Sequence, residues 1–249
     1  MAVKIGFIGA GGNANWHMDM LKDVPDAKVV AVTDLAFEKA KAAGEKHGAR
    51  AYASHKEMLD KEELDCCYIS VPPYQHGEPE IDVIHKGLPF FVEKPLATTP
   101  ELAQDILERI EKHGIGTCVG YQIRYLDTMD KAKEMLKGAM ISAVQGHYFC
   151  GAIGGWYTRR ALSGGQITEQ ATHMLDLGRF LAGDVKSVVG KCKRVRDWTP
   201  PAGWEPGTGL VSYWPGMDIP DTTALILEYE SGAMGTLSCS LVPQVAWDN

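Results

Sequence analysis

Short apolar runs alternate with amphipathic segments through the first 120 residues of the chain. The runs are VKIGFIG (3–9), KVVAVTD (28–34), DCCYISVP (65–72), LPFFVE (88–93) and IGTCVGYQ (115–122). The segments between them carry apolar residues at helical spacing. Strands that alternate with helices predict right-handed βαβ units and a parallel sheet. We therefore expect a doubly wound α/β domain over residues 1–121.

The pattern changes after Tyr121. A predicted helix at about 125–137 is followed by longer strand-like runs, which are ISAVQGHYFC (141–150), KSVVGKCKRVRD (186–197), TTALILEYE (222–230) and AMGTLSCSLV (233–242). The last two are joined by a predicted turn at Ser231-Gly232. Residues 122–249 therefore predict an α+β domain with a mostly antiparallel sheet. The segment 198–220, rich in Pro, Gly and Trp, predicts a long loop that is either functional or mobile.

Composition narrows the class of partner. The chain has 249 residues, of which 45% are hydrophobic and 23% charged, so it can bury a sizeable core. Its formal charge is −7 and it contains no long basic run, which argues against binding to nucleic acid or a membrane surface. No stretch reaches the roughly 20 apolar residues that span a bilayer. We expect a small-molecule partner.

The cysteines and the N-terminus indicate a reducing, cytoplasmic setting. The six cysteines form no C-x-x-C motif and no Cys/His cluster with metal spacing, so we expect thiols of the core and no metal site. The N-terminal apolar run passes directly into glycines, without the longer apolar core and cleavage site of a signal peptide.

A glycine turn follows the first predicted strand. Gly9, Gly11 and Ala14 stand in G-x-G-x-x-A order, and Asp34 ends the second strand. This context predicts a dinucleotide site: Gly9 makes the turn, Gly11 lets the backbone approach the pyrophosphate, and Ala14 permits close packing. Asp34 would bind the adenine-side ribose, which favours NAD over NADP. The alternative is a tight turn of an α/β protein that binds no nucleotide.

The run FVEKP ends the strand before the predicted fourth helix and places Lys94 at its tip, because Pro95 disfavours helix there. Alone, this reads as an exposed lysine that closes a strand. The chain also contains VPPYQH (71–76), GYQIRY (120–125) and WYTRRALSGGQITEQATHMLDLGRFLAG (156–183). With these motifs, the glycine turn and FVEKP, the chain resembles the Gfo/Idh/MocA oxidoreductases, which include glucose-fructose oxidoreductase and inositol dehydrogenase. Glu169 replaces the commoner aspartate, and Val71 the usual threonine.

The resemblance covers residues 3 to 240 and implies a Rossmann domain, a second domain that binds substrate, and a frequent cis peptide at Lys94-Pro95. The cofactor residues that we assign are Gly9, Gly11, Gly12, Asn13, Ala14, Asp34, Ser70, Pro72, His76, Glu93, Lys94 and Gln122. The substrate residues are Lys94, Arg124, Trp156, Glu169 and His173. Three of the assigned cofactor and substrate residues also have structural alternatives, which are a helix-start role for His76, an interdomain ion pair for Arg124 and loop packing for Trp156.

The segment 168–183 predicts a helix with two faces. Its apolar stripe, which is Ala171, Met174, Leu175, Gly178 and Ala182, should pack on the sheet. Glu169, His173 and Asp176 lie on the opposite face, which periodicity alone would assign to solvent, with Glu169 and His173 forming an i, i+4 pair. Given the resemblance, we expect this face to line the cleft between the domains.

These residues predict hydride transfer between NAD and a secondary alcohol of a sugar, a polyol or a related compound. His173 would be the general base. Lys94 would stabilise the developing negative charge on the reacting oxygen. Glu169 would hold the substrate or orient the imidazole, and Glu93 would anchor backbone or cofactor groups. Two alternatives remain: a hydrolase or lyase with NAD as internal oxidant, and an inactive regulator that binds the cofactor.

The chain stops just after a strand, whereas members of the resembled family run considerably further. We therefore expect either a truncated chain or a sheet surface that a partner subunit covers. Because family members commonly associate through this sheet, we expect a homo-oligomer, a dimer or a tetramer. The remaining histidines His17, His47, His55, His85 and His113 are interpreted as surface or packing residues.

Overall fold

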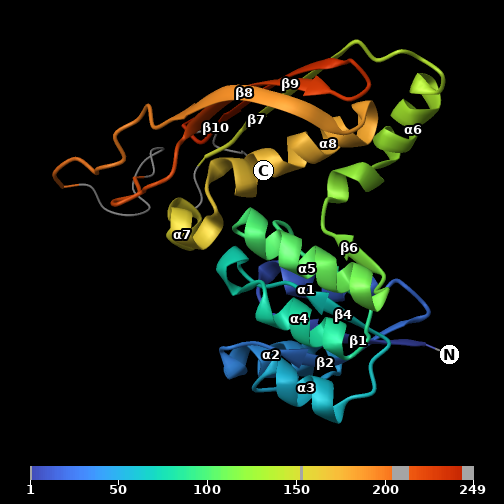
Figure 1. Ribbon diagram of the computed structural model, residues 1–249. Helices are drawn as coiled ribbons and strands as arrows, with labels where there is room; N and C mark the ends of the chain where they lie inside the picture. Colours follow the sequence, from blue (N-terminus) through green and yellow to red (C-terminus); the bar gives the residue numbers. More distant parts are fainter. Residues whose placement is uncertain (1, 152–153, 204–212, 243–249) are drawn as a thin grey trace. The chain divides into compact units, whose positions relative to one another are not determined.

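The computed structural model describes residues 2–151, 154–203 and 213–242 (Figure 1). The chain divides into two compact units, Met1–Gly120 and Tyr121–Asn249. Trp204, for which we expect either sugar stacking or loop packing, lies outside the described residues.

The first unit contains a six-stranded sheet in the order β3-β2-β1-β4-β5-β6. Its strands are β1 (Val3–Ile8), β2 (Ala27–Thr33), β3 (Arg50–Tyr52), β4 (Cys66–Ile69), β5 (Phe90–Val92) and β6 (Thr117–Val119). Every neighbouring pair runs parallel, which confirms the predicted doubly wound α/β sheet. The strand order reverses between β1 and β4, where open α/β sheets bind their ligands.

Helices cover both faces of this sheet. They are α1 (Gly12–Leu21), α2 (Phe37–His47), α3 (His55–Lys61), α4 (Glu78–His85) and α5 (Pro100–His113), with a 3₁₀ turn η1 (Pro73–Gln75). Along β1 the side chains alternate: Phe7 joins the core under α1 and α2, and Ile8 joins the core under α3, α4 and α5. Both faces of the sheet are therefore buried, which explains why its strands appear in the sequence as continuous apolar runs.

The second unit contains a four-stranded sheet in the order β7-β10-β9-β8. Its strands are β7 (Ala143–Phe149), β8 (Val185–Lys193), β9 (Thr222–Tyr229) and β10 (Met234–Ser240). β9 pairs antiparallel with both β8 and β10, and β7 pairs parallel with β10. The mostly antiparallel α+β prediction is therefore confirmed, and the Ser231-Gly232 turn joins β9 to β10, with Gly232 at a φ of 85°.

The helical elements of the second unit precede β8 or flank β7. They are η2 (Gln122–Tyr125), α6 (Asp127–Leu136), η3 (Gly155–Thr158), α7 (Arg160–Ser163), the π-helical turn η4 (Ile167–Ala171) and α8 (Thr172–Ala182). α8 lies along the sheet (Figure 1) and packs Met174 and Leu175 on it, as its apolar stripe predicts. At Gly178 an added Cβ would lie 2.4 Å from the Tyr229 hydroxyl, so helix and sheet approach closely.

A buried carboxylate anchors the chain between β8 and β9. Asp221 is fully buried, and its oxygens accept hydrogen bonds from the backbone N–H groups of Val195 and Arg196 at 2.9 and 3.0 Å. They also accept from the Trp198 indole at 2.9 Å and from the Thr222 hydroxyl at 3.0 Å. Several donors compensate the cost of burying this charge. The described part of the predicted long loop is therefore tied to the sheet at both ends.

Two expectations need correction. The cysteines are not all core thiols: Cys67 and Cys239 are buried, but Cys118 and Cys192 are exposed on strands β6 and β8. The predicted helix 168–183 is not a continuous α-helix, because residues up to Ala171 form the π-helical turn. In the part of the chain that the structure describes, no helix is long and apolar enough to cross a bilayer.

His47 is a buried histidine that composition does not distinguish from a surface one. Its side chain, at the C-terminal end of α2, is only 2% exposed. Neither ring nitrogen has a hydrogen-bond partner among the described residues. Burial lowers the pKa of His47 below its ordinary value, with a further contribution from Lys22, and outweighs the opposing effect of Asp19, which lies 4.0 Å from Nε2. The folded unit therefore favours the neutral imidazole.

This pKa shift makes stability depend on pH. The unfolded chain, with an ordinary histidine pKa of about 6.5, binds more protons than the folded chain just below that pH, so stability is full above it and falls on acidification. We expect His47→Gln to reduce the loss of unfolding free energy between about pH 7.5 and about pH 5.5. Urea titrations followed by circular dichroism measure it. His85→Gln, on the exposed end of α4, is the matched control, and an unchanged pH dependence in His47→Gln would contradict the assignment.

Candidate functional site

The glycine turn after β1 is shaped by a close backbone approach. Gly9 has a φ of 104°, and a Cβ added there would lie 2.1 Å from the carbonyl oxygen of Ser70. The Gly9 N–H donates to the Thr33 carbonyl at 2.8 Å, and the Ser70 N–H donates to the Ile8 carbonyl at 2.8 Å. The ends of β1, β2 and β4 thus converge on one residue that only glycine can occupy without strain.

The next two glycines open toward space that a ligand could fill. A Cβ added at Gly11 or Gly12 would meet no described atom within 4 Å. Gly11 is the N-cap of α1, whose first turn contains no acidic residue. The Asn15 side-chain amide donates to the Ala10 and Gly11 carbonyls at 2.9 and 3.0 Å and so fixes the turn. The N–H groups of this helix start suit the negative charge of a pyrophosphate.

Asp34 follows β2 and bridges two loops. One carboxylate oxygen accepts the Ala10 N–H at 2.9 Å, and the other accepts the Ala36 N–H at 2.9 Å. Each oxygen of a carboxylate has two lone pairs, so both retain capacity for a ligand hydroxyl. The side chain is therefore held in position beside the glycine turn.

These residues line a cavity of about 510 Å³ within the first unit. Of the predicted cofactor residues, Gly9, Gly11, Asp34, Ser70 and Pro72 line it. Sequence reasoning missed other lining residues, among them Lys39, Ser54, His55, Lys56 and Tyr74. They lie in or next to the first turns of α2 and α3 and in η1, which are separate from the glycine turn along the sequence, so no local motif marks them. The glycine cradle, the helix start and the fixed carboxylate fit a dinucleotide.

Other predicted cofactor residues have different surroundings. Ala14, in the first turn of α1, is fully buried, as close packing of the helix requires, and Asn13 of the same turn is exposed. Gln122, in η2 of the second unit, is exposed.

His76 is part of a buried pair. Its Nδ1 lies 2.6 Å from Glu80 Oε1, and the other carboxylate oxygen accepts the Gly77 N–H at 2.6 Å. Both side chains are 0% exposed. The pair fixes the start of α4, which is the structural alternative considered for His76, and a direct cofactor contact through His76 stays a prediction.

Lys94 emerges just after β5. The Glu93 N–H donates to the Ile69 carbonyl at 2.8 Å, which continues the pairing of β5 with β4. The Lys94 N–H donates to Glu93 Oε2 at 3.2 Å, and the Lys94-Pro95 peptide is cis. Lys94 is half-buried. The lysine therefore stands at the same edge of the sheet as the glycine turn, where parallel strands present their carboxyl ends.

In the second unit, Glu169 lies in the π-helical turn and His173 in the first turn of α8. Both residues are 8% exposed, so this face is not the solvated surface that periodicity alone would give. π-Helical turns are rare and occur frequently at functional sites. The His173 ring stacks with Tyr148 at 6.3 Å and meets Tyr121 edge-on at 6.4 Å. The two tyrosines therefore flank the imidazole.

Two buried glutamines attach the π-helical turn to the sheet. The Gln166 amide donates to Gln170 Oε1 and to the Asp221 carbonyl, both at 2.9 Å, and accepts from the Thr223 hydroxyl at 2.6 Å. The Gln170 amide donates to the Tyr148 carbonyl at 3.2 Å. These side-chain amides therefore link the turn to β7 and to the start of β9. Sequence reasoning missed these two glutamines, because their burial depends on tertiary contacts that no local sequence pattern indicates.

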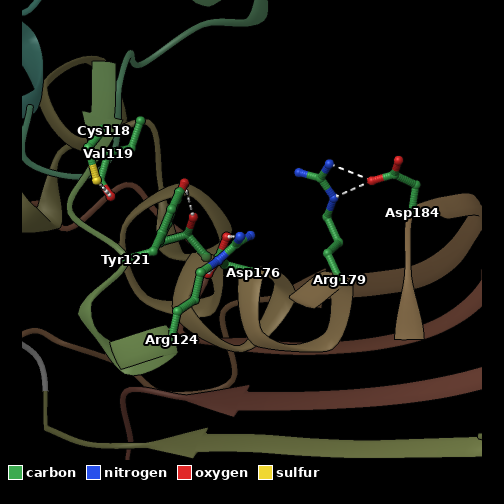
Figure 2. Close-up of polar contacts among 8 residues, drawn as sticks. Cys118, Val119, Tyr121, Arg124, Asp176, Arg179 and Asp184 are labelled. Atoms are coloured by element: carbon green, nitrogen blue, oxygen red, sulfur yellow. Dashed lines mark hydrogen bonds and ion pairs between the residues drawn. The ribbon is translucent and has the colours of Figure 1, made fainter. Parts of the chain in front are cut away.

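Arg124 is held by a carboxylate of its own unit. Figure 2 shows its guanidinium facing Asp176 on α8, with Nε 2.6 Å from Oδ2 and a second contact from Nη2 to Oδ1. Asp176 raises the pKa of Arg124 above its ordinary value, and the Phe180 ring lies 5.0 Å from the guanidinium carbon. The hydroxyl of Tyr121, which Figure 2 also labels, lies 3.1 Å from the Thr172 hydroxyl. A substrate contact through Arg124 stays a prediction.

Trp156 is partly buried against an apolar cluster of the second unit. Tyr157, Trp198, Met217 and Leu241 form that cluster with Ile219. This packing is the structural alternative considered for Trp156, and substrate stacking stays a prediction.

The described residues contain no group of three or more His, Cys, Asp or Glu side chains that could hold a metal ion.

Two family models match the chain. The model described as an oxidoreductase family with an NAD-binding Rossmann fold matches residues 3–121. The model of the GFO/IDH/MocA C-terminal domain matches residues 104–248.

Curated relatives are similar at a modest level. The inositol 2-dehydrogenase of Ralstonia nicotianae is 29% identical over 190 residues, which cover 74% of this chain and 56% of that protein. The rhizopine catabolism protein MocA of Rhizobium meliloti is 24% identical over 187 residues, which cover 72% and 57%. The chain spans a little over half the length of such relatives, between 53% and 57%.

Solved structures share the fold. A levoglucosan dehydrogenase in complex with NADH and levoglucosan aligns with a TM-score of 0.86 at 18% identity, over 100% of this chain and 69% of that one. The WlbA dehydrogenase of Bordetella pertussis, in complex with NADH and UDP-GlcNAcA, aligns with a TM-score of 0.82 at 23% identity, over 97% and 68%. Because the C-terminal family model covers more than half of the chain, the chain belongs to the Gfo/Idh/MocA family of oxidoreductases.

Proposed function

We propose that this chain is an NAD-dependent dehydrogenase that acts on a secondary alcohol of a sugar, a polyol or a related compound. The observation that carries the proposal is the combination, within one unit, of the Gly9 and Gly11 cradle, the fixed Asp34 carboxylate and Lys94 at the same sheet edge. Relatives named as inositol 2-dehydrogenase and glucose-6-phosphate 3-dehydrogenase support the substrate class. The bound NAD would supply the hydride acceptor.

NAD is favoured over NADP because of the charge beside the adenine-side ribose. The Asp34 carboxylate, held by two backbone amides, would accept hydrogen bonds from ribose hydroxyls and repel a 2′-phosphate. Lys56, which lines the same cavity, is already paired with Glu78 at 2.5 Å. Lys39 also lines this cavity, and we assign the preference for NAD to the Asp34 carboxylate because it is fixed beside the glycine turn.

In the proposed chemistry the two units contribute different groups. The Lys94 ammonium donates a hydrogen bond to the substrate oxygen and stabilises the negative charge that develops on it. His173 takes the hydroxyl proton on a ring nitrogen and returns it in the reverse direction. Glu169, four residues before His173, positions the substrate or the imidazole. The proposal requires Lys94 and His173 to act on the same alcohol.

We further propose that the chain works as a homo-oligomer, a dimer or a tetramer. One face of the second-unit sheet exposes apolar side chains on all four strands, and these are Phe149 (50%), Val189 (72%), Ile226 (54%) and Met234 (49%). In β8 and β9, Val189 is the direct partner of Ile226, so these two side chains are neighbours. Val189 and Ile226 therefore form an exposed apolar pair on this face, which a second copy of the chain could cover.

Substitution of Asp34 tests the cofactor assignment. We expect Asp34→Ser to weaken NADH binding by about tenfold or more and to reduce the discrimination against NADPH, because the 2′-phosphate no longer meets a carboxylate. Titration by nucleotide fluorescence measures both dissociation constants. Asp60→Ser, on the exposed side of α3, is the matched control. An unchanged preference in Asp34→Ser would remove this residue from the cofactor site.

Turnover tests the catalytic assignment. With a panel of sugars and polyols, absorbance of reduced nicotinamide should rise for the parent protein, and Lys94→Ala and His173→Ala should each lower kcat by about 10² to 10³. Lys112→Ala and His113→Ala, at the end of α5, are the matched controls.

Three outcomes would contradict the catalytic proposal. Turnover of Lys94→Ala and His173→Ala within a few-fold of the parent would show that the roles are wrong. Substrate conversion without net NADH would favour the hydrolase or lyase that uses NAD as internal oxidant. Retained NAD binding without turnover of any alcohol or glycoside would favour the inactive regulator.

A charge on the exposed sheet face tests the oligomer. We expect the parent chain to have at least twice the monomer mass by light scattering after gel filtration, and Ile226→Glu to be monomeric because a carboxylate cannot be buried there without a partner. Leu107→Glu, an exposed apolar position of α5, is the control. A monomeric parent, or an Ile226→Glu variant with the parent's mass, would rule out this interface.

A further inference from the structure

His17 lies on the second turn of α1, the helix whose first turn belongs to the glycine cradle. Its ring is surrounded by aromatic side chains and meets Trp16, Phe91 and Tyr68 edge-on, at 5.0, 5.0 and 5.8 Å. The side chain is 16% exposed. The imidazole is therefore fixed in one orientation, and our interpretation of His17 as an ordinary surface or packing residue is incomplete.

That orientation directs a ring nitrogen at Glu93. His17 Nε2 lies 2.7 Å from Glu93 Oε1, and the Glu93 side chain is 13% exposed. The second carboxylate oxygen accepts the N–H of Lys94 at 3.2 Å. One carboxylate thus joins α1 to the peptide from which the Lys94 side chain starts.

The carboxylate has little freedom to take another position. An added Cβ at Gly120, just after β6, would lie 3.1 Å from Glu93 Oε2 and 3.0 Å from the ζ carbon of Phe91. The Gly120 N–H donates to the Val92 carbonyl at 2.8 Å, so this glycine is held against the end of β5. The Glu93 side chain is enclosed by α1, the β5 end and the β6 end.

We infer that His17 is a positioning residue: through Glu93 it fixes the Lys94 peptide relative to the helix that holds the cofactor phosphates. The inference rests on the proposed role of Lys94 and adds a residue to it. Without the imidazole, the Glu93 carboxylate loses its contact with α1 and no longer holds the Lys94 N–H in one geometry. The lysine would then sample positions from which it cannot reach the reacting oxygen, while cofactor binding stays intact.

The first experiment reads the Lys94 peptide directly and needs no substrate. Amide hydrogen exchange, followed by NMR, should show faster exchange at Lys94 by about tenfold in His17→Phe, which keeps an aromatic ring but has no hydrogen-bonding nitrogen. The Phe7 amide in β1 reports on the stability of the whole unit. In His17→Gln the side-chain amide nitrogen is as many bonds from Cα as Nε2, so slow exchange at Lys94 should return.

The second experiment separates positioning from stability in the enzyme. His17→Phe should lower kcat by about tenfold with little change in KM for NAD, and His17→Gln should restore most of kcat. Glu93→Gln combined with His17→Phe should be no worse than either alone, because both break the same link. His113→Phe, on α5, is the control for an aromatic replacement of a histidine.

The readouts distinguish failure of this inference from failure of the proposed function. Unchanged Lys94 exchange in His17→Phe, or exchange that rises equally at Phe7, would overturn the inference. So would a His17→Gln variant that remains as impaired as His17→Phe. If no alcohol is oxidised by the parent chain, the proposed function fails, and the exchange experiment still decides whether His17 holds the Lys94 peptide.

Discussion

The cofactor half of the candidate site depends on the contact between the backbone at Gly9 and the carbonyl of Ser70. A side chain at this position would collide with the end of β4, so β1 and β4 can converge only because residue 9 has no Cβ. That convergence lies where the strand order reverses, and it creates the cavity beside the turn. Gly11 and Asp34 acquire their roles from it, since both flank the same turn.

In the second unit, the main constraint is that an irregular helical segment must be held against a sheet. The π-helical turn departs from regular α-helical pairing, and its buried polar side chains must find partners. Gln166 and Gln170 supply the connections to β7 and β9, so side-chain hydrogen bonds attach the turn that carries Glu169 to the sheet. Tyr121 and Tyr148 pack around the His173 ring in the adjacent first turn of α8.

The sequence predicts those features that depend on neighbours along the chain. The parallel sheet, the glycine turn and the apolar stripe of α8 follow from periodicity and from the conformational range of glycine, and the structure confirms them. The π-helical turn breaks the helical period at Ala171, and no residue of 167–171 signals the break. The His17–Glu93 contact joins residues 76 positions apart, so it becomes visible only when α1 and β5 are placed side by side.

Several acidic side chains among the described residues hold backbone amides. Asp34, Glu80, Glu93 and Asp221 each accept at least one backbone N–H at the end of a strand or the start of a helix. An acid at such a place therefore does not by itself indicate ligand binding, and the remaining acceptor capacity decides between the two roles. Asp34 keeps one lone pair on each oxygen beside an open cavity, which suits a ribose. In Glu93 one oxygen faces an imidazole and the other faces the next peptide, and the side chain is enclosed, so its function is to hold the lysine that follows it.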